Sequence, residues 1–292
     1  MKQNREIEPA PNFGRAAYHH HFKDHVMKTL IDIGANLCHD SLIKRLEKVL
    51  ERAQQHNVTR MIVTGSDVPS SEQALLLAQQ YKDILFATAG IHPHHAGTVT
   101  KEDFSVISDL TKHVDIRAVG ETGLDFNRDF SPRPDQERVF EQHIELAIEI
   151  AKPLFLHERD AFSRFYPIIK QYRDQISDAV VHCFTGEKEA LYAYLDLDLH
   201  IGITGWLCDE RRGQHLLPLI SEIPKNRLMI ETDAPYLLPR NIRPKPKSRT
   251  NEPAFLPWIV QTISECTGES IEQIARQTTD TAEAFFGLSK PK

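Results

Sequence analysis

Eight short apolar segments alternate with amphipathic ones along the chain, and this alternation restricts the fold more than any other feature. The expected strands are Leu30–Asn36, Arg60–Gly65, Ile84–Ile91, Ile116–Glu121, Pro153–His157, Ala179–Phe184, His200–Thr204 and Arg227–Thr232. Most are almost continuously apolar, as strands buried on both faces of a parallel sheet are. A βα unit of about 25 residues, repeated eight times, predicts an α/β fold of the (β/α)8 or TIM-barrel type.

The segments between the strands read as helices. Ser41–Gln55 and Pro132–Ile150 repeat apolar residues at intervals of three and four, which predicts helices with one buried face. A proline-rich loop is expected over Pro239–Pro253, followed by closing helices over Pro253–Cys266 and Ser270–Phe286. The alternative is a doubly wound open sheet, but no G-x-G-x-x-G follows any expected strand, so the barrel is favoured.

Composition limits the class of protein. The chain has 292 residues, of which 29–288 are expected to form a single barrel domain and 1–28 a disordered extension without a signal peptide. No apolar run approaches the roughly 18 residues of a membrane helix. The four cysteines are scattered without a C-x-x-C pair, which favours a reducing cytoplasm. A net charge of −6 excludes a general polyanion-binding coat but not a local basic patch.

Polar residues, most of them ionisable, end most of the expected strands, at the edge where barrel enzymes carry their active sites. These residues are Asn36, His92, Glu121, His157, His182 and Asp233. A lone histidine at a strand end is more often a core residue, but polar residues recurring in phase with the repeat are hard to explain by packing. Two histidines and two carboxylates predict a divalent metal site, which we assign to Glu121, His157, His182 and Asp233. Such a site activates water and polarises a carbonyl or phosphoryl oxygen.

Cys183 directly follows His182, which raises the alternative of a thiol–imidazole dyad. Successive side chains of a strand point to opposite faces, so the two groups would not meet. With His182 directed into the barrel, Cys183 is expected to pack against the helices.

A basic segment follows the last expected strand. Arg240, Arg243, Lys245, Lys247 and Arg249 fall within ten residues, and two prolines between them favour an extended chain. The segment is either a solvated loop or a positive rim beside the barrel mouth, to which Arg159, Arg211 and Arg212 would add. A cationic rim around a metal hydrolase site predicts a phosphate-bearing substrate.

Seven motifs at these positions resemble those of the TatD family of metal-dependent deoxyribonucleases. They are GIHPH (Gly90–His94), GETGLDF (Gly120–Phe126), FLHERDA (Phe155–Ala161), HCFTG (His182–Gly186), IGITGW (Ile201–Trp206), ETDAPYLLPR (Glu231–Arg240) and TNEP (Thr250–Pro253). They occur in the family's order and at its spacing, which makes the combination far more specific than any one motif.

The resemblance implies an amidohydrolase-like TIM-barrel hydrolase that uses a divalent metal, commonly Mg²⁺, to cleave phosphodiesters from the 3′ end of single-stranded DNA or RNA. It implies Glu121, His157 and His182 as metal ligands, Asp233 as the aspartate of the eighth strand, and His92 as an active-site histidine. The chain departs from many members on the first strand, where Gly34 and Asn36 replace an H-x-H pair.

We therefore expect a cytoplasmic, monomeric 3′–5′ exonuclease of single strands that uses Mg²⁺, with Mn²⁺ or Zn²⁺ as alternatives. Its catalytic residues would be Asp233, Glu121 and His92. Its substrate-binding residues would be Asn36, His92, His94, Arg159, Arg211, Arg240, Lys245 and Lys247. Two other readings remain: an amidohydrolase acting on a small cyclic amide or ester, and a nucleic-acid-binding protein whose catalytic site has decayed.

Overall fold

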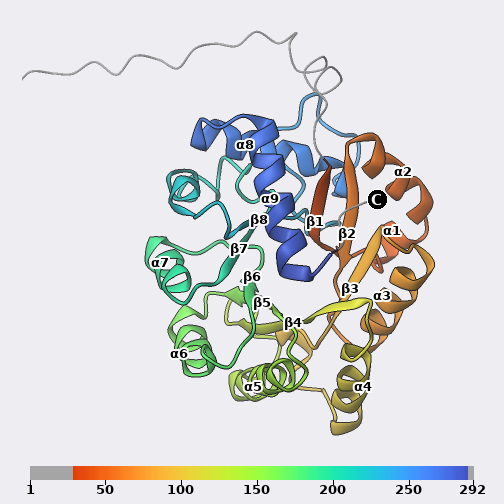
Figure 1. Ribbon diagram of the computed structural model, residues 1–292, viewed down its shortest axis with the longest axis vertical. Helices are drawn as coiled ribbons and strands as arrows, with labels where there is room; N and C mark the ends of the chain where they lie inside the picture. Colours follow the sequence, from red (N-terminus) through yellow and green to blue (C-terminus); the bar gives the residue numbers. More distant parts are fainter. Residues whose placement is uncertain (1–28, 289–292) are drawn as a thin grey trace, which may run out of the picture.

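Eight parallel strands form one sheet in chain order in the computed structural model, which describes residues 29–288 (Figure 1). The strands are β1 (Leu30–Ala35), β2 (Val58–Val63), β3 (Leu85–Ala89), β4 (Ile116–Asp125), β5 (Leu154–Arg159), β6 (Ala179–Val181), β7 (His200–Ile203) and β8 (Leu228–Ile230). The predicted TIM barrel is confirmed. The expected extension over residues 1–28 lies outside the described residues.

Helices surround the barrel. They are α1 (Asp40–Ile43), α2 (Leu46–Gln55), α3 (Val68–Gln80), α4 (Lys101–Thr111), α5 (Arg133–Ile150), α6 (Phe162–Tyr172), α7 (Lys188–Asp196), α8 (Leu256–Thr267) and α9 (Ile271–Phe286), with 3-10 turns η1 (Pro93–His95), η2 (Leu217–Glu222) and η3 (Pro253–Phe255). Within residues 29–288, no helix combines the length and apolar character needed to cross a bilayer.

One predicted helix is divided. The single helix expected over Ser41–Gln55 is wrong, because the chain leaves the helical region at Arg45, with φ at −137°. The Arg45 guanidinium there pairs with Glu252 at 2.7 Å, and Arg52 on α2 reaches the other oxygen of the same carboxylate at 2.7 Å. This shared ion pair ties α2 to the segment just before η3.

The barrel closes where β1 meets β8. Asp233 N–H donates to Gly34 O at 2.8 Å, and Asn36 N–H donates to Ala234 O at 2.8 Å. Nearer the start of β1, a side chain replaces the backbone hydrogen bonds between β1 and β8: the Asp32 carboxylate accepts the Thr232 N–H on Oδ1 at 2.9 Å. The closure sets Asn36 beside Asp233.

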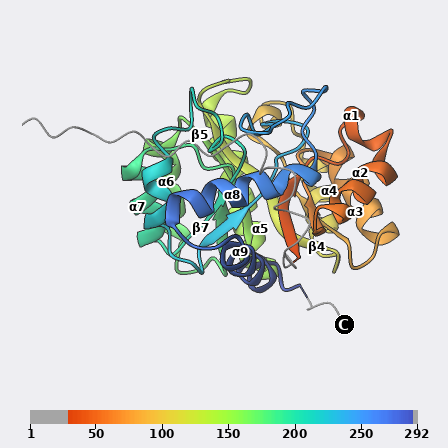
Figure 2. The same cartoon turned by 90° about the horizontal axis from the view of Figure 1, so that it is seen from above.

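The barrel interior is apolar at the end where the strands begin. One buried cluster joins residues of seven strands with the last turns of α9: Ile31, Ile33, Ile62, Phe86, Ala118, Phe155, Val180, Met229, Ala282, Phe285, Phe286 and Leu288. Helix α9 lies across this end of the barrel, whereas the loop after β8 lies at the opposite end (Figure 2). The polar strand ends are thus open to substrate while α9 seals the other end.

Two glycines allow β4 to lie close against β5. Gly120 and Gly123 have φ values of +143° and +141°. A Cβ on Gly120 would lie 2.1 Å from Phe155 O, and one on Gly123 would lie 1.9 Å from His157 O. Only glycine fits this backbone conformation and this approach. The GETG motif therefore brings Glu121 next to the histidine of β5.

His143 on α5 holds the turn that follows β3. Ile91 N–H donates to His143 Nε2 at 3.0 Å, so a neutral ring carries its proton on Nδ1 and donates to Val139 O at 2.7 Å. Complete burial lowers the pKa of His143 to about 4. The neutral ring thus fixes the backbone directly before His92.

Acid should weaken this anchor. Since the pKa of His143 falls from 6.5 to about 4 on folding, its contribution is complete above pH 6.5 and is lost as the pH falls toward 4. When the pH is lowered from 7 to 5, we expect the loss of this contribution to reduce the free energy of unfolding by about 2 kcal/mol. Urea denaturation at both pH values, compared with His143→Gln, isolates the effect because other groups titrate alike in both proteins. Equal losses of stability in the two proteins would contradict the assignment.

Candidate metal centre

A cavity of about 280 Å³ opens at the carboxyl ends of the strands. Its lining residues are Asn36, Ser66, His92, His94, His95, Glu121, His157, His182, Cys183, Asp233 and Tyr236. The structure thus brings together seven predicted site residues from the ends of six strands: Asn36, His92, His94, Glu121, His157, His182 and Asp233. A concave site in which titratable groups converge is a candidate active site.

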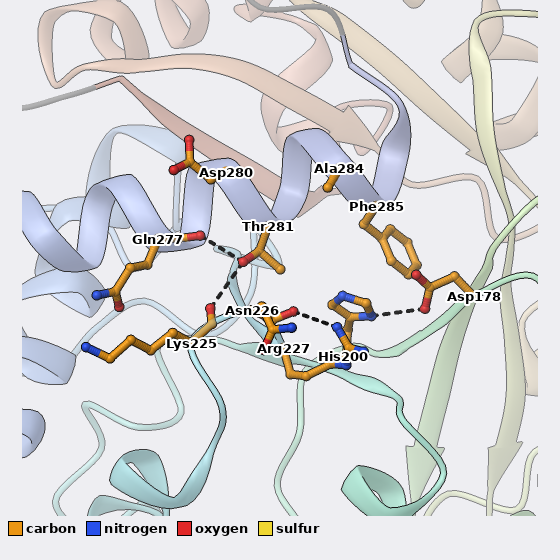
Figure 3. A pocket seen from close by; sticks show the side chains of 10 residues that line it. All are labelled: Asp178, His200, Lys225, Asn226, Arg227, Gln277, Asp280, Thr281, Ala284 and Phe285. Carbon is orange, nitrogen blue, oxygen red and sulfur yellow. Dashed lines mark hydrogen bonds and ion pairs between the residues drawn. The ribbon is translucent and has the colours of Figure 1, made fainter.

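A larger cavity, of about 450 Å³, lies at the opposite end of the barrel beside α9 (Figure 3). Most of its charged groups are paired with one another or with near neighbours. Asp178 Oδ1 lies 3.0 Å from His200 Nδ1, and Lys225 Nζ lies 2.7 Å from Glu269 Oε2. Such pairs stabilise the ends of elements, so size alone does not make this cavity the functional site.

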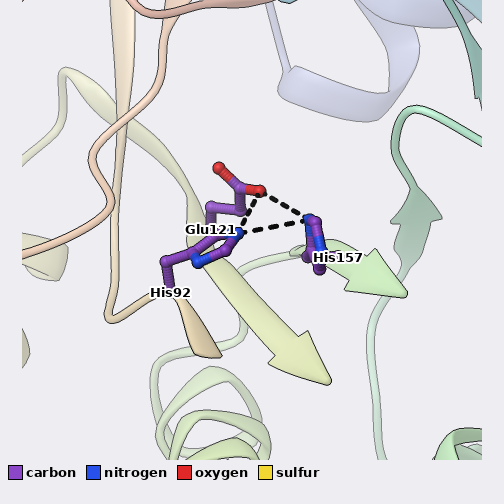
Figure 4. A group of neighbouring side chains, drawn as sticks. All are labelled: His92, Glu121 and His157. Carbon is purple, nitrogen blue, oxygen red and sulfur yellow. Dashed lines mark hydrogen bonds and ion pairs between the residues drawn. The ribbon is translucent and has the colours of Figure 1, made fainter. Parts of the chain in front are cut away.

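The Glu121 carboxylate is the centre of the first cavity. Its Oε1 lies 2.8 Å from His182 Nε2, 3.0 Å from His157 Nδ1 and 3.2 Å from His92 Nε2. Figure 4 shows the imidazoles of His92 and His157 converging on this oxygen. The side chain of Glu121 is only 8% exposed. One buried oxygen therefore meets three ring nitrogens.

Two of these nitrogens face Glu121 with their lone pairs when the rings are neutral. The other nitrogen of His157, Nε2, lies 3.4 Å from Asp125 Oδ2, and the other nitrogen of His182, Nδ1, lies 3.3 Å from Glu231 Oε2. These carboxylates favour the ring protons on their own side. His157 Nδ1 and His182 Nε2 then carry lone pairs that face the lone pairs of Glu121 Oε1. Such an arrangement is stable only if a proton or a metal ion lies between the nitrogen and the oxygen.

In the absence of a metal ion, protons on the two imidazoles separate their nitrogens from the Glu121 oxygen. Burial opposes the charged form of His182, but the charges of Glu121 and Glu231 outweigh it and hold the pKa well above its usual range. Burial likewise opposes charge on His157, yet hydrogen bonds to Asp125 and Glu121 raise its pKa. Burial would raise the pKa of Glu121, but His182 and His92 hold it well below its usual range. A divalent ion would replace the two imidazole protons.

The spacing of the donors fits such an ion. Ligands on adjacent positions of a six-coordinate ion with bonds of about 2.1 Å lie about 3.0 Å apart. The separations from Glu121 Oε1 to His157 Nδ1 and His182 Nε2 are 3.0 and 2.8 Å. Carboxylate oxygens and imidazole nitrogens are both common ligands of divalent metal ions in proteins. The residues present therefore fit a divalent metal.

His92 also belongs geometrically to this group, because one of its ring nitrogens lies within 4.8 Å of ligand atoms of Glu121 and His157. Its tautomer sets it apart. The His94 N–H donates to His92 Nδ1 at 3.1 Å, so a neutral ring carries its proton on Nε2. Burial lowers the pKa of His92 to about 4, although the negative charge of Glu121 opposes this shift. The ring is therefore neutral. His92 thus offers a hydrogen bond to an oxygen.

Asp233 lies on the far side of the cavity, beside the seam of the barrel. Its Oδ1 accepts a hydrogen bond from Asn36 Nδ2 at 2.9 Å. Burial raises the pKa of Asp233 to about 7; the charge of His182 opposes this shift, while those of Glu121 and Glu231 add to it. A carboxyl group with a pKa near neutrality suits a general base.

Glu231 is a site residue that was not predicted from the sequence. Its side chain is fully buried, and Oε1 accepts the Cys183 N–H at 2.5 Å while Oε2 faces His182. A Cβ on Gly34 would lie 2.2 Å from Oε2, so the Glu231 carboxylate occupies the space above Gly34. The sequence held a signal: Glu231 is an acidic residue directly after the apolar run of β8, and strand ends are where the other site residues were predicted.

Asp125 was missed as well. It ends β4, which continues beyond the predicted end at Glu121, and its Oδ2 lies 2.8 Å from His94 Nε2. Its Oδ1 accepts the N–H groups of Asn127 and Arg128 at 3.0 and 2.7 Å. Although burial would raise the pKa of Asp125, the hydrogen bonds lower it strongly. Asp125 is therefore an ionised acceptor for His94, and its Oδ2 also lies 3.4 Å from His157 Nε2.

The prediction that Cys183 packs against the helices is wrong, since it lines the cavity. Strand β6 ends at Val181 and Cys183 has φ at +47°, so the alternation of strand side chains does not extend to it. Burial, reinforced by the charges of Asp233 and Glu231, holds the pKa of its thiol well above the usual range. A thiol that stays protonated is a poor nucleophile, and no dyad with His182 results.

The predicted basic residues lie outside the cavity lining, and several are already paired. Arg211 lies 2.9 Å from the buried carboxylate of Asp209, and Arg240 lies 2.8 Å from Glu210. These pairs offset part of the positive charge that the sequence predicts for the rim. Lys245 and Lys247 are exposed in the loop after β8, with no ion pair among the described interactions.

Arg159 forms part of a stack instead. Its guanidinium lies 4.7 Å from the ring centroid of Trp206, and that of Arg212 lies 4.1 Å from the same ring. Arg159 Nη1 also donates to Thr185 Oγ1 at 2.6 Å. Cation–π contacts thus hold two arginines in place, one at the end of β5 and one after β7.

Comparison with known proteins identifies the family. The family model for TatD-related DNases matches residues 31–287. A Pantoea ananatis protein named 3′-5′ ssDNA/RNA exonuclease TatD is 45% identical over 259 residues, covering 89% of this chain and 100% of that protein. This match confirms the resemblance seen in the motifs.

Solved structures agree with the fold. A TatD family hydrolase from Entamoeba histolytica has a TM-score of 0.81 at 25% identity, covering 91% of this chain and 100% of that one. The TatD homologue YJJV from Escherichia coli has a TM-score of 0.81 at 23% identity, covering 89% and 98%. From the family match and the 45% identity together, this chain belongs to the TatD-related DNase family.

Proposed function

We propose that this protein is a cytoplasmic, monomeric Mg²⁺-dependent exonuclease that degrades single-stranded DNA and RNA from the 3′ end. The observation that carries the proposal is Glu121 Oε1, which faces ring nitrogens of His157 and His182 at 3.0 and 2.8 Å. Relatives at 45% identity that are named 3′-5′ ssDNA/RNA exonucleases support the substrate.

The chemistry follows from the roles that the side chains can fill. A divalent ion held by Glu121, His157 and His182 supplies the charge that polarises a phosphoryl oxygen and acidifies water. Asp233, with its raised pKa, accepts the proton of the attacking water, and Asn36 orients the Asp233 carboxylate. His92 donates its Nε2–H to a phosphate oxygen, because its Nδ1 is occupied by the His94 N–H. Asp125 and Glu231 hold His157 and His182 in the required tautomers.

The test is hydrolysis of single strands labelled at one end. Purified protein with Mg²⁺ should release mononucleotides from the 3′ end of DNA and RNA, and a chelator should stop the release. Hydrolysis that survives the chelator, or that starts at the 5′ end, would contradict the proposal. Turnover of a small cyclic amide without turnover of strands would establish the amidohydrolase reading, and strand binding without any turnover would establish a decayed site.

We also propose that the lysines of the loop after β8 contact the strand. Replacing Lys245 and Lys247 by Gln should weaken single-strand binding and flatten its salt dependence by up to about one unit per contact, because each phosphate contact releases counterions. Fluorescence anisotropy between about 50 and 200 mM salt measures the slope.

The matched control is the pair Lys82→Gln and Lys112→Gln, which removes the same charge from exposed loops before β3 and β4. Hydrolysis of bis-p-nitrophenyl phosphate should change far less than hydrolysis of long strands, since it requires the metal but no groove. An unaltered salt slope, or equal loss on both substrates, would refute the role of the loop.

A further inference from the structure

Tyr236 is the feature of the cavity that the proposed chemistry does not use. It is the only residue with a phenyl-type ring among the described lining residues; the others are histidines, carboxylates, Asn36, Ser66 and Cys183. Those groups recognise metal and phosphate but offer no apolar face to a substrate. Yet Tyr236 is 52% exposed, so its ring lines the cavity and faces solvent at once.

The backbone that carries the ring is held by hydrogen bonds, and the ring has one aromatic neighbour. Tyr236 N–H donates to Asp233 O at 2.9 Å, which closes a tight turn directly after the candidate base. Asn251, fully buried, donates its backbone N–H to Pro235 O at 3.0 Å and its side-chain amide to Thr232 O at 2.9 Å. The ring of His39 meets the Tyr236 ring edge-on, with centroids 5.8 Å apart. The backbone that carries the ring is therefore already ordered before a ligand stacks on it, which limits the entropy lost on binding.

A nucleobase is the ligand that suits this position. Single strands present unstacked bases, and an aromatic side chain can bind the face of any base. With a phosphate at the metal centre, the neighbouring base would lie within reach of Tyr236, because Tyr236 lines the same cavity of about 280 Å³. In a duplex the same face is covered by the next base pair, so such a contact also favours single strands.

We propose that Tyr236 is a stacking platform for a nucleobase that adjoins the scissile phosphodiester. The inference rests on the proposed nuclease function and adds to it a subsite that recognises the face of one base without reading its sequence. Binding of the strand then has two anchors, the phosphate at the metal centre and one base at the rim.

Strands that lack a single base test the proposal. Each of the last four nucleotides at the 3′ end is replaced in turn by an abasic one, and kcat/KM is measured for each strand. At one position the wild type should lose on the order of tenfold, the usual range for stacking on an aromatic side chain. Tyr236→Ala should lose a similar factor on the intact strand and should no longer distinguish it from the abasic one.

Three further variants separate the effect of the ring from the effects of apolar bulk and of the hydroxyl group. Tyr236→Phe keeps the ring and should keep the preference for the base, whereas Tyr236→Leu keeps apolar bulk without a π face and should lose it. Tyr192→Ala removes a ring that is 39% exposed on α7, and should keep the wild-type preference. If Phe loses the preference as completely as Ala, the hydroxyl group is responsible and the stacking proposal is overturned.

The outcomes also separate this inference from the proposed function. A wild type that degrades intact and abasic strands equally at every position, or a Tyr236→Ala variant that keeps the preference, overturns the stacking platform and leaves the nuclease intact. A wild type that hydrolyses bis-p-nitrophenyl phosphate but no strand overturns both proposals.

Discussion

Glu121→Ala is expected to lower the rate of strand hydrolysis by roughly 10³-fold or more, the loss that follows when several kcal/mol of transition-state stabilisation by a metal ion disappear. The variant removes the oxygen that faces three imidazoles, so His157 and His182 keep no carboxylate between them. Isothermal titration with Mn²⁺ or Mg²⁺ should show the accompanying loss of metal affinity. Circular dichroism should be unchanged, because Glu121 lies in the polar mouth of the barrel rather than in its apolar interior.

Glu121→Gln is the matched variant, since it keeps the shape of the side chain and removes the charge. It should be almost as inactive as Glu121→Ala. If either variant retained near-wild-type turnover with one bound metal per chain, the assignment of this site would be wrong.

Asp233→Asn should reduce turnover by roughly 10²–10⁴-fold, the range for loss of a general base. An amide oxygen can still accept the hydrogen bond from Asn36 Nδ2, so the local structure should persist. The acid limb of the wild-type pH–rate profile, which reports ionisation of Asp233, should vanish in the variant. In the wild type the bound cation should move this limb below the pKa of about 7 that burial gives Asp233 without metal.

Metal titration decides between the two roles of Asp233. As a base, its replacement should leave metal affinity within a few-fold of the wild type. If metal occupancy and activity fall together, Asp233 is a ligand and the role of base is refuted.

The sequence was sufficient to predict the barrel because parallel strands buried on both faces are recorded as apolar runs. It was less informative where the backbone departs from regular geometry. The two glycines of β4 have positive φ values, and this strand continues to Asp125, beyond its predicted end at Glu121. The helix expected from Ser41 breaks at Arg45, which pairs with Glu252, a residue about 200 positions away. No local pattern contains such a partner.

The same division holds for the site. Residues at strand ends could be predicted, because the barrel brings those ends together. Glu231 and Asp125 were not predicted, because neither stands at the end of a strand as expected from the sequence: Glu231 falls within Arg227–Thr232, and Asp125 lies four residues beyond Glu121. Cys183 was misplaced because β6 ends two residues before it. Pairing of Arg211 and Arg240 with acidic neighbours is a matter of side-chain conformation, which residue order does not contain.

The position of α9 across one end of the barrel has a consequence for how the protein is made. Translation at about 5–20 residues per second separates the appearance of β1 from that of β8 by roughly 10–40 s, during which the sheet stays open on the ribosome. Phe155 and Met229 remain uncovered longer still, because Phe285 and Phe286 of the same buried cluster are synthesised more than 50 residues after β8. A nascent chain that stops before Ile271 would carry every residue of the metal centre and still expose its apolar interior, and it is therefore expected to be captured by chaperones and degraded.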